Sequence, residues 1–114
     1  MEVQREIVLP TTREDAWEAL TEPSRLEQWF ATEVELDLRE GGVAVFRWGD
    51  GDARRAEVVT VDEEERLVLL FEDDGVVDVR LADDEDGTRV LVRESTPQWG
   101  TALELSALAS WAVA

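Results

Sequence analysis

Arginine and carboxylate side chains carry most of the chemistry that this sequence offers. The chain has 28 Asp and Glu residues and 11 Arg residues, with no His, Cys, Lys or Tyr. The commonest general base, the thiol nucleophile and the commonest transition-metal ligands are therefore absent. Ser95, Ser106 and Ser110 have no identifiable activating partner. We expect no cofactor and no metal site, and catalysis stays an open question without a positive sign in its favour.

Four charged residues stand among apolar strand positions, where they could meet a bound molecule. They are Arg47, Glu57, Arg93 and Glu94. A buried Arg–Glu pair could fix a carbonyl or hydroxyl group of a ligand, but surface or cross-strand pairing is the simpler interpretation and the one we favour. The acidic runs at 73–74 and 83–86 lack the spacing and the glycine of a calcium loop, and we interpret them as solvated turns.

Two short helical patterns come before the strands that would hold these residues. Thr12 is a good N-cap with Asp15 three residues later to reach back, and Pro23 suits the first turn of a second helix. Ser24 with Glu27 repeats the capping pattern. Apolar residues recur at helical spacing in both segments: Ala16, Trp17, Leu20, Leu26, Trp29 and Phe30.

Seven segments have the composition of β-strands and are joined by short turns. They span residues 3–9, 33–38, 43–48, 53–61, 66–72, 76–82 and 88–95. Short connections imply an antiparallel meander. From Gln98 to Ala114 apolar residues recur at helical spacing, over about 25 Å at 1.5 Å per residue. The pattern predicts an α+β domain over residues 1–114: a curved seven-stranded antiparallel sheet wrapped around a long C-terminal helix, with two short helices between strands 1 and 2.

Composition excludes several classes of partner. The net charge is −17, which repels phosphate backbones and anionic membranes, so we expect neither nucleic-acid nor membrane binding. No signal-peptide pattern or long apolar span is present, and we expect a cytoplasmic protein that is a monomer or a weak dimer.

The order of elements resembles the helix-grip arrangement of the START-like superfamily, also called SRPBCC. The branch related to activators of the heat-shock protein 90 ATPase has similar motifs along the whole chain. Near the start they are Arg5-Glu6-Ile7, Leu9-Pro10, Trp17 to Thr21, Pro23, Leu26 and Gln28-Trp29-Phe30. Later they are Gly41-Gly42, Glu57-Val58, Val61-Asp62, Arg66-Leu67, Phe71, Gly87-Thr88-Arg89, Trp99, Leu103 and Leu108.

The resemblance implies a cavity between the concave sheet and the C-terminal helix. With strict alternation, one face of the strands presents Phe46, Trp48, Val59, Val61, Leu69, Phe71, Val79, Leu81, Val90 and Val92, and the last helix adds Trp99, Leu103 and Trp111. These side chains either line a cavity for a flat or aliphatic apolar ligand or simply fill the core. We assign Trp17, Trp29 and Phe30 to the packing of the sheet.

Three functions follow from the resemblance and the apolar strand faces. The leading one is non-enzymatic binding of a small hydrophobic molecule such as a lipid, a polyketide or another metabolite. The second is a protein-interaction role like that of a chaperone cofactor, through an outward patch of Val68 and Leu70 joined by Val58 or Val76. The third is an aromatase or cyclase of polyketide metabolism.

Overall fold

The structure is a computed structural model that describes residues 2–72 and 74–95, except for the side chain of Val3. The elements are β1 (Val3–Leu9), α1 (Arg13–Thr21), α2 (Pro23–Trp29), β2 (Glu33–Leu36), β3 (Val43–Arg47), β4 (Ala53–Asp62), β5 (Arg66–Phe71), β6 (Val76–Asp84) and β7 (Gly87–Glu94). They confirm the two helices and seven strands that the sequence predicts. The expected helix over 98–114 lies outside the described residues.

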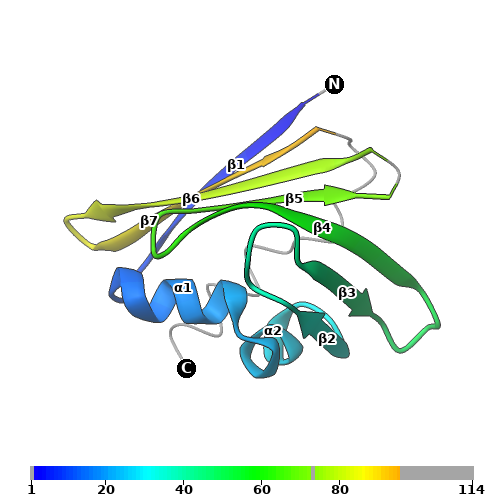
Figure 1. Cartoon of the computed structure of the whole chain (residues 1–114). Coiled ribbons are helices and arrows are strands. Elements are labelled where there is room, and N and C mark those ends of the chain that lie inside the picture. The colour runs from blue at the N-terminus through cyan, green and yellow to red at the C-terminus, as the bar shows by residue number, and fades with distance from the viewer. Residues whose placement is uncertain (1, 73, 96–114) are drawn as a thin grey trace.

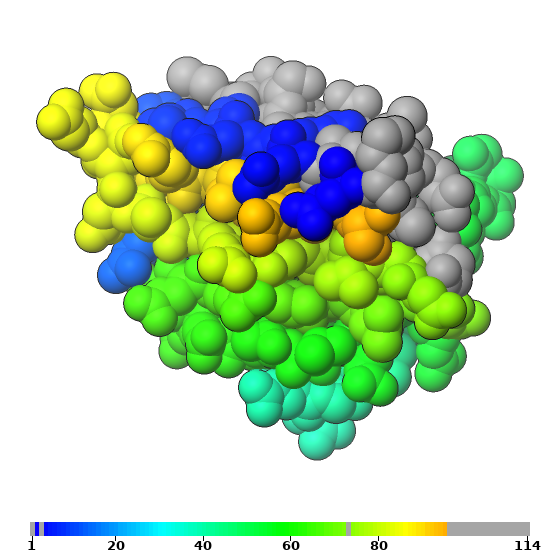
Figure 2. All heavy atoms as spheres, turned by 90° about the horizontal axis from the view of Figure 1, so that it is seen from above, coloured from blue at the N-terminus to red at the C-terminus, as the bar shows by residue number. Residues whose placement is uncertain are grey.

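The strands form one antiparallel sheet in the order β1-β7-β6-β5-β4-β3-β2. Strands β2 to β7 make the predicted meander, and β1 pairs with β7 to form one edge of the sheet. The sheet is curved, and α1 and α2 lie against its concave side (Figure 1). Helix α1 packs against β6 and β7, whereas α2 packs against β2 and α1. Seen from above, from the side away from the two helices, the strands cross the outer face as successive bands from β1 in blue to β2 and β3 in cyan-green (Figure 2).

Helix α1 begins at the predicted cap. The hydroxyl oxygen of Thr12 accepts a hydrogen bond from the Asp15 backbone N–H at 3.1 Å, which satisfies one of the free donors of the first turn. The Asp15 carboxylate accepts a hydrogen bond from the Thr11 hydroxyl at 2.8 Å and pairs with Arg25 of α2 at 3.4 Å. The same carboxylate therefore links the capping turn to the second helix.

The predicted cap of α2 is wrong. Ser24 lies inside the first turn, because the helix begins at Pro23 and its N-cap position is Glu22, whose side chain makes no capping bond. Glu27 has a different role from the one expected. Its carboxylate accepts a hydrogen bond from the backbone N–H of Val34 at 3.0 Å, and this bond ties α2 to the start of β2.

Strand β4 does not alternate strictly. Val58 pairs with Leu69, but Thr60 pairs with Val68, so one residue is inserted between two ladder positions. This β-bulge turns Val59 outward, where it is 43% exposed, while Val58 is buried on the inner face. The expected inward orientation of Val59 is therefore wrong, and the inner face resumes at the half-buried Val61.

The junction between β7 and β1 depends on one glycine. Gly87 has a φ of +140°, and a Cβ atom at this position would collide with the backbone carbonyl oxygen of Leu9. The next residue, Thr88, is fully buried and its hydroxyl donates a hydrogen bond to the carbonyl of Thr11 at 2.9 Å. These contacts hold the start of β7 against the end of β1, where the chain enters α1.

Candidate functional site

An apolar cavity lies between the two helices and the inner face of the sheet. Its volume is about 40 Å³. The lining residues come from both helices, from Phe30 at the end of α2 and from four strands, and they are Leu20, Leu26, Trp29, Phe30, Leu36, Phe46, Leu67, Leu69, Phe71, Val77 and Val79. None of these side chains carries a charge, and the indole nitrogen of Trp29 is their only polar atom. The chemistry of this lining suits an apolar guest and not a reaction.

The size of the cavity limits what it holds without rearrangement. A volume of about 40 Å³ has room for a few water-sized molecules, and a cavity with so apolar a wall tends to stay dry. Sites for drug-sized ligands occupy roughly 300–1,000 Å³. A ligand of that class therefore requires the lining side chains to move apart.

Aromatic rings form the wall of the cavity nearest α2. The ring of Phe30 meets Phe46 and Trp48 edge-on, with centroids 5.3 Å and 5.4 Å away. The indole of Trp29 donates a hydrogen bond to the carbonyl of Ala19 at 2.9 Å, and the indole of Trp48 donates to the carbonyl of Phe30 at 2.9 Å. Both bonds hold indole rings in fixed orientations, because a buried indole N–H otherwise loses its partner.

The predicted site residues divide into four groups. Those that line the cavity are Phe46, Leu69, Phe71 and Val79. Leu81 and Val92 are buried in the core beside it, whereas Trp48 and Val61 are half-buried and pack against the core. Val59 is exposed at the bulge. Trp99 and Leu103, like Trp111, lie outside the described residues.

Seven lining residues were not assigned to the cavity from the sequence. They are Leu20, Leu26, Trp29, Phe30, Leu36, Leu67 and Val77. The helical spacing of Leu26, Trp29 and Phe30 was visible, but it indicates only that the three share a face. That this face meets the inner face of the sheet at Phe46 depends on how the helices pack.

The four charged candidates do not all face the same side of the sheet, because side chains alternate between its two faces. Arg47 is exposed and donates a hydrogen bond to Glu35 at 2.7 Å, as expected for cross-strand pairing. Glu57 and Arg93 are exposed as well. Glu94 alone points inward, where it is 1% exposed. It shares the inner face of β7 with Thr88, Val90 and Val92, all fully buried.

The carboxyl group of Glu94 is buried without a hydrogen bond. Neither of its oxygens has a partner among the residues that the structure describes. Burial raises the pKa of Glu94 above the ordinary glutamate value, and the positive charge of Arg5 opposes part of this rise. Arg5 is on the same face of β1, opposite Val92. Buried polar atoms are nearly always paired, so this carboxyl group is an exception that calls for an explanation.

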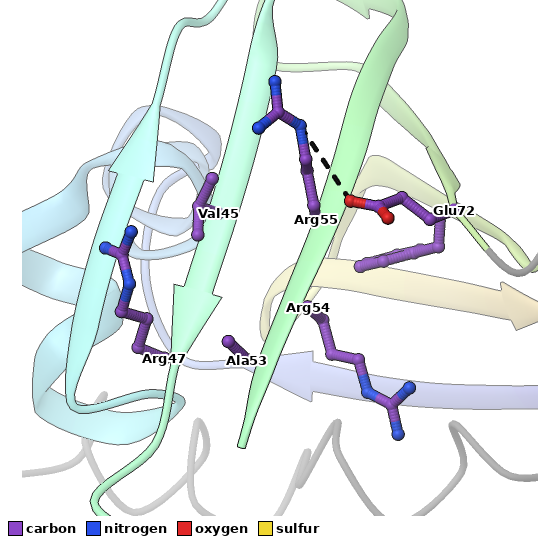
Figure 3. Close-up of a pocket in the computed structure, with 7 residues that line it drawn as sticks. Val45, Arg47, Ala53, Arg54, Arg55 and Glu72 are labelled. Atoms are coloured by element: carbon purple, nitrogen blue, oxygen red, sulfur yellow. Dashed lines mark ion pairs between the residues drawn. The ribbon is translucent and has the colours of Figure 1, made fainter. Parts of the chain in front are cut away.

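A larger hollow of about 290 Å³ lies where β3 and β5 end and β4 begins, lined by Val45, Arg47, Ala53, Arg54, Arg55, Phe71 and Glu72. Figure 3 shows Arg54 pointing away from Arg55, so the guanidinium groups do not converge. Arg55 approaches Glu72 at 3.9 Å and Arg54 approaches Asp52 at 3.9 Å. Exposed and partly neutralised arginines make a weak anion site, and we prefer the smaller apolar cavity as the candidate site.

The acidic turn after β6 is held by arginines. Asp84 accepts a hydrogen bond from the Asp86 backbone N–H at 3.0 Å and from Arg89 at 2.8 Å, and these bonds lower the pKa of Asp84. Asp83 pairs with Arg13 at 3.2 Å. Within residues 2–72 and 74–95, no three acidic side chains gather as a metal ion would require. In the same part of the chain, no helix is both long and apolar enough to span a bilayer.

A profile of the family described as activator of Hsp90 ATPase homolog 1-like protein matches residues 10–110. None of the curated proteins matches the chain.

Several solved structures share the fold. DynU16, a protein of the dynemicin biosynthetic locus, has 24% sequence identity and a TM-score of 0.86, over 96% of this chain and 46% of DynU16. An AHSA1-like protein from Aeromonas hydrophila has 22% identity and a TM-score of 0.77, over 97% of this chain and 84% of its own. A protein from Mesorhizobium loti has 21% identity and a TM-score of 0.76, over 83% and 76%. At these identities the likeness concerns the fold.

Proposed function

Since the chain belongs to the family of activator of Hsp90 ATPase homolog 1-like proteins, we propose that it binds a small hydrophobic molecule on the inner face of its sheet. The observation that carries the proposal is the apolar cavity between α1, α2 and strands β2, β3, β5 and β6. Apolar lining with few polar groups is typical of sites that hold ligands by contact area.

The shape of the lining favours a flat or aliphatic ligand. Phe30, Phe46 and Phe71 offer ring faces and edges, with the centroids of Phe46 and Phe71 6.2 Å apart. Leu26 and Leu69 add aliphatic surface to the same lining. Leucine side chains change rotamer more readily than the indole of Trp29, which is held by a hydrogen bond to the carbonyl of Ala19, so the leucines are the groups that make room. Apolar area removed from water supplies about 25 cal/mol per Å² towards binding.

The likeness to DynU16 supports a small-molecule role over other roles. DynU16 belongs to a biosynthetic locus, and its fold is shared over 96% of this chain. Polyketides and lipids are the candidate ligands. An aromatase or cyclase role draws on the same likeness, but none of the side chains that line the cavity is an acid, a base or a nucleophile.

The test uses methyl resonances as internal reporters. Protein with labelled Leu and Val methyl groups is titrated with octan-1-ol, and native mass spectrometry counts the bound molecules. Methyl shifts are expected at Leu69, Val77 and Val79, which line the cavity. The methyls of Val59 and Leu70 are exposed on the outer face and act as the matched control. Shifts confined to the outer methyls, or none below the solubility limit, would contradict the proposal.

A protein-interaction role is the second candidate, and one observation favours it. Leu70 is 38% exposed on the outer face, opposite Val76 on the neighbouring strand. Val68 is buried, which reduces the patch that the sequence suggested. The test is a pull-down with a purified Hsp90-type chaperone. Retention that Leu70→Glu abolishes, in a variant that keeps its melting temperature, would favour this role over ligand binding.

A further inference from the structure

The strand register places Glu94 beside the wall of the cavity. The strand register sets a row of inward side chains across four strands: Val58 pairs with Leu69, Leu69 with Val77, and Val77 with Glu94. Leu69 and Val77 both line the cavity. Side chains directly opposite each other have Cβ atoms about 5 Å apart. Glu94 is therefore the next inward position beyond the cavity wall formed by Val77.

A carboxyl group at this position is costly to the protein alone. Glu94 is 1% exposed and neither oxygen has a hydrogen-bond partner among the described residues. Every other member of its row is apolar, so a leucine or valine would continue the pattern. A buried polar atom without a partner loses its bonds to water and gains none in return. A ligand that supplies the missing hydrogen bond would remove this cost.

We infer that Glu94 is the polar recognition group of the cavity and that the ligand is a neutral apolar molecule carrying a hydroxyl group. The inference rests on the proposed ligand-binding function and specifies its ligand class. The apolar body of the ligand would lie against Leu69 and Val77, and its hydroxyl would reach the carboxyl of Glu94. Glu94 binds the ligand and takes no part in any reaction.

Charge on the inner face favours a neutral hydroxyl over an ionic group. An ammonium group needs an ionised Glu94, but burial favours the neutral carboxyl, and Arg5 on β1 already supplies a positive charge nearby. A carboxylate ligand meets repulsion whenever Glu94 is ionised. A hydroxyl both donates and accepts, and so it can pair with the carboxyl group in either protonation state.

Two isomers separate the role of the hydroxyl from that of the apolar body. Octan-1-ol and heptyl methyl ether have the same formula, but only the alcohol donates a hydrogen bond. We expect the wild-type protein to bind the alcohol about tenfold more tightly than the ether, the ratio that one hydrogen bond to a buried partner provides. In Glu94→Leu the preference for the alcohol should be lost, because its hydroxyl then has no partner in the cavity. Glu94→Gln, which keeps a hydrogen-bonding group of the same size, should retain part of the preference.

Each outcome is decisive. Equal binding of alcohol and ether by the wild type would overturn the inference while the proposed function stands. Tighter binding of octylammonium or octanoate than of octan-1-ol would overturn it as well. No binding of either isomer would overturn the proposed function and the inference together. If Glu94→Leu does not fold, an alcohol preference that is unchanged in Glu94→Gln would also contradict the role of Glu94.

Discussion

Glu94→Leu is expected to make the protein more stable, although it changes a residue that is only 1% exposed. Both carboxyl oxygens lack a partner among the described residues, and each such group costs about 1–3 kcal/mol when buried. Leucine has a similar size and would extend the apolar row of Leu69 and Val77. Allowing for imperfect packing, we expect the free energy of unfolding to rise by about 2 kcal/mol. For a domain of this size that is a rise in melting temperature of about 8 °C.

The assay is urea unfolding followed by tryptophan fluorescence, with a thermal melt as the second measurement. Glu57→Leu is the matched control, because it makes the same substitution at an exposed position on the outer face. Its effect should stay within about 0.5 kcal/mol. A Glu94→Leu variant that is less stable than the wild type would show that the carboxyl is satisfied in the folded protein. The reasoning from its burial would then fail.

The stabilisation should also depend on pH. The pKa of Glu94 is raised in the folded state, mainly by burial. Between the unfolded value, about 4.3, and the higher folded value, the folded protein binds more protons than the unfolded chain. The contribution of Glu94 to stability is therefore present at low pH and is lost as the pH rises through the folded pKa. The advantage of Glu94→Leu should grow over this window, and an advantage that shrinks with rising pH would contradict the assignment.

Four further substitutions test the frame that holds the site, each by urea unfolding. Gly87→Ala should cost at least about 2 kcal/mol, because φ is +140° there and the new Cβ meets the carbonyl oxygen of Leu9. Thr12→Ala should cost about 1 kcal/mol through loss of the α1 cap, whereas Ser24→Ala should be nearly neutral. Asp78→Asn should cost about 1 kcal/mol near pH 7. Burial alone would raise the pKa of Asp78, but hydrogen bonds from two arginines outweigh it and lower that pKa in the folded protein. The difference in the free energy of unfolding between Asp78→Asn and the wild type should therefore vanish as the pH falls through the folded pKa. Equal costs at Thr12 and Ser24, or a pH-independent cost at Asp78, would contradict these accounts.

The elements of the fold could be predicted because local signals agreed with one another. Alternation and short turns located all seven strands, and the family resemblance is confirmed by the match over residues 10–110. The failures occurred where a local pattern was ambiguous. Ser24 and Glu22 both stand near Pro23, and a proline at the first helical position selects the residue before it as the cap. The bulge at Val59 has no sequence signal, since every residue from Val58 to Val61 suits a strand.

The candidate site was harder to predict, because it depends on contacts between elements. Phe46, Leu69, Phe71 and Val79 follow from strand alternation. Trp29 and Phe30 required the packing of α2 against the sheet, which periodicity alone does not determine. Glu94 was recognisable as a charged residue at the end of an apolar strand, but only the register shows that it is the inward one and that Arg93 is not. A two-residue period places neighbours on opposite faces, so an error of one residue reverses the assignment.

The small cavity and the buried carboxyl are better explained together than apart. An empty volume of about 40 Å³ needs no ligand, since leucine and phenylalanine packing often leaves gaps of this order. The carboxyl group of Glu94 next to this cavity lowers stability. Packing alone does not explain it, because a leucine would fill the same space without that cost. Apolar contact alone also discriminates weakly between ligands, whereas a buried polar group that must be satisfied rejects any guest without the matching hydrogen. Glu94 beside Val77 therefore fits a site in which stability is given up for selectivity.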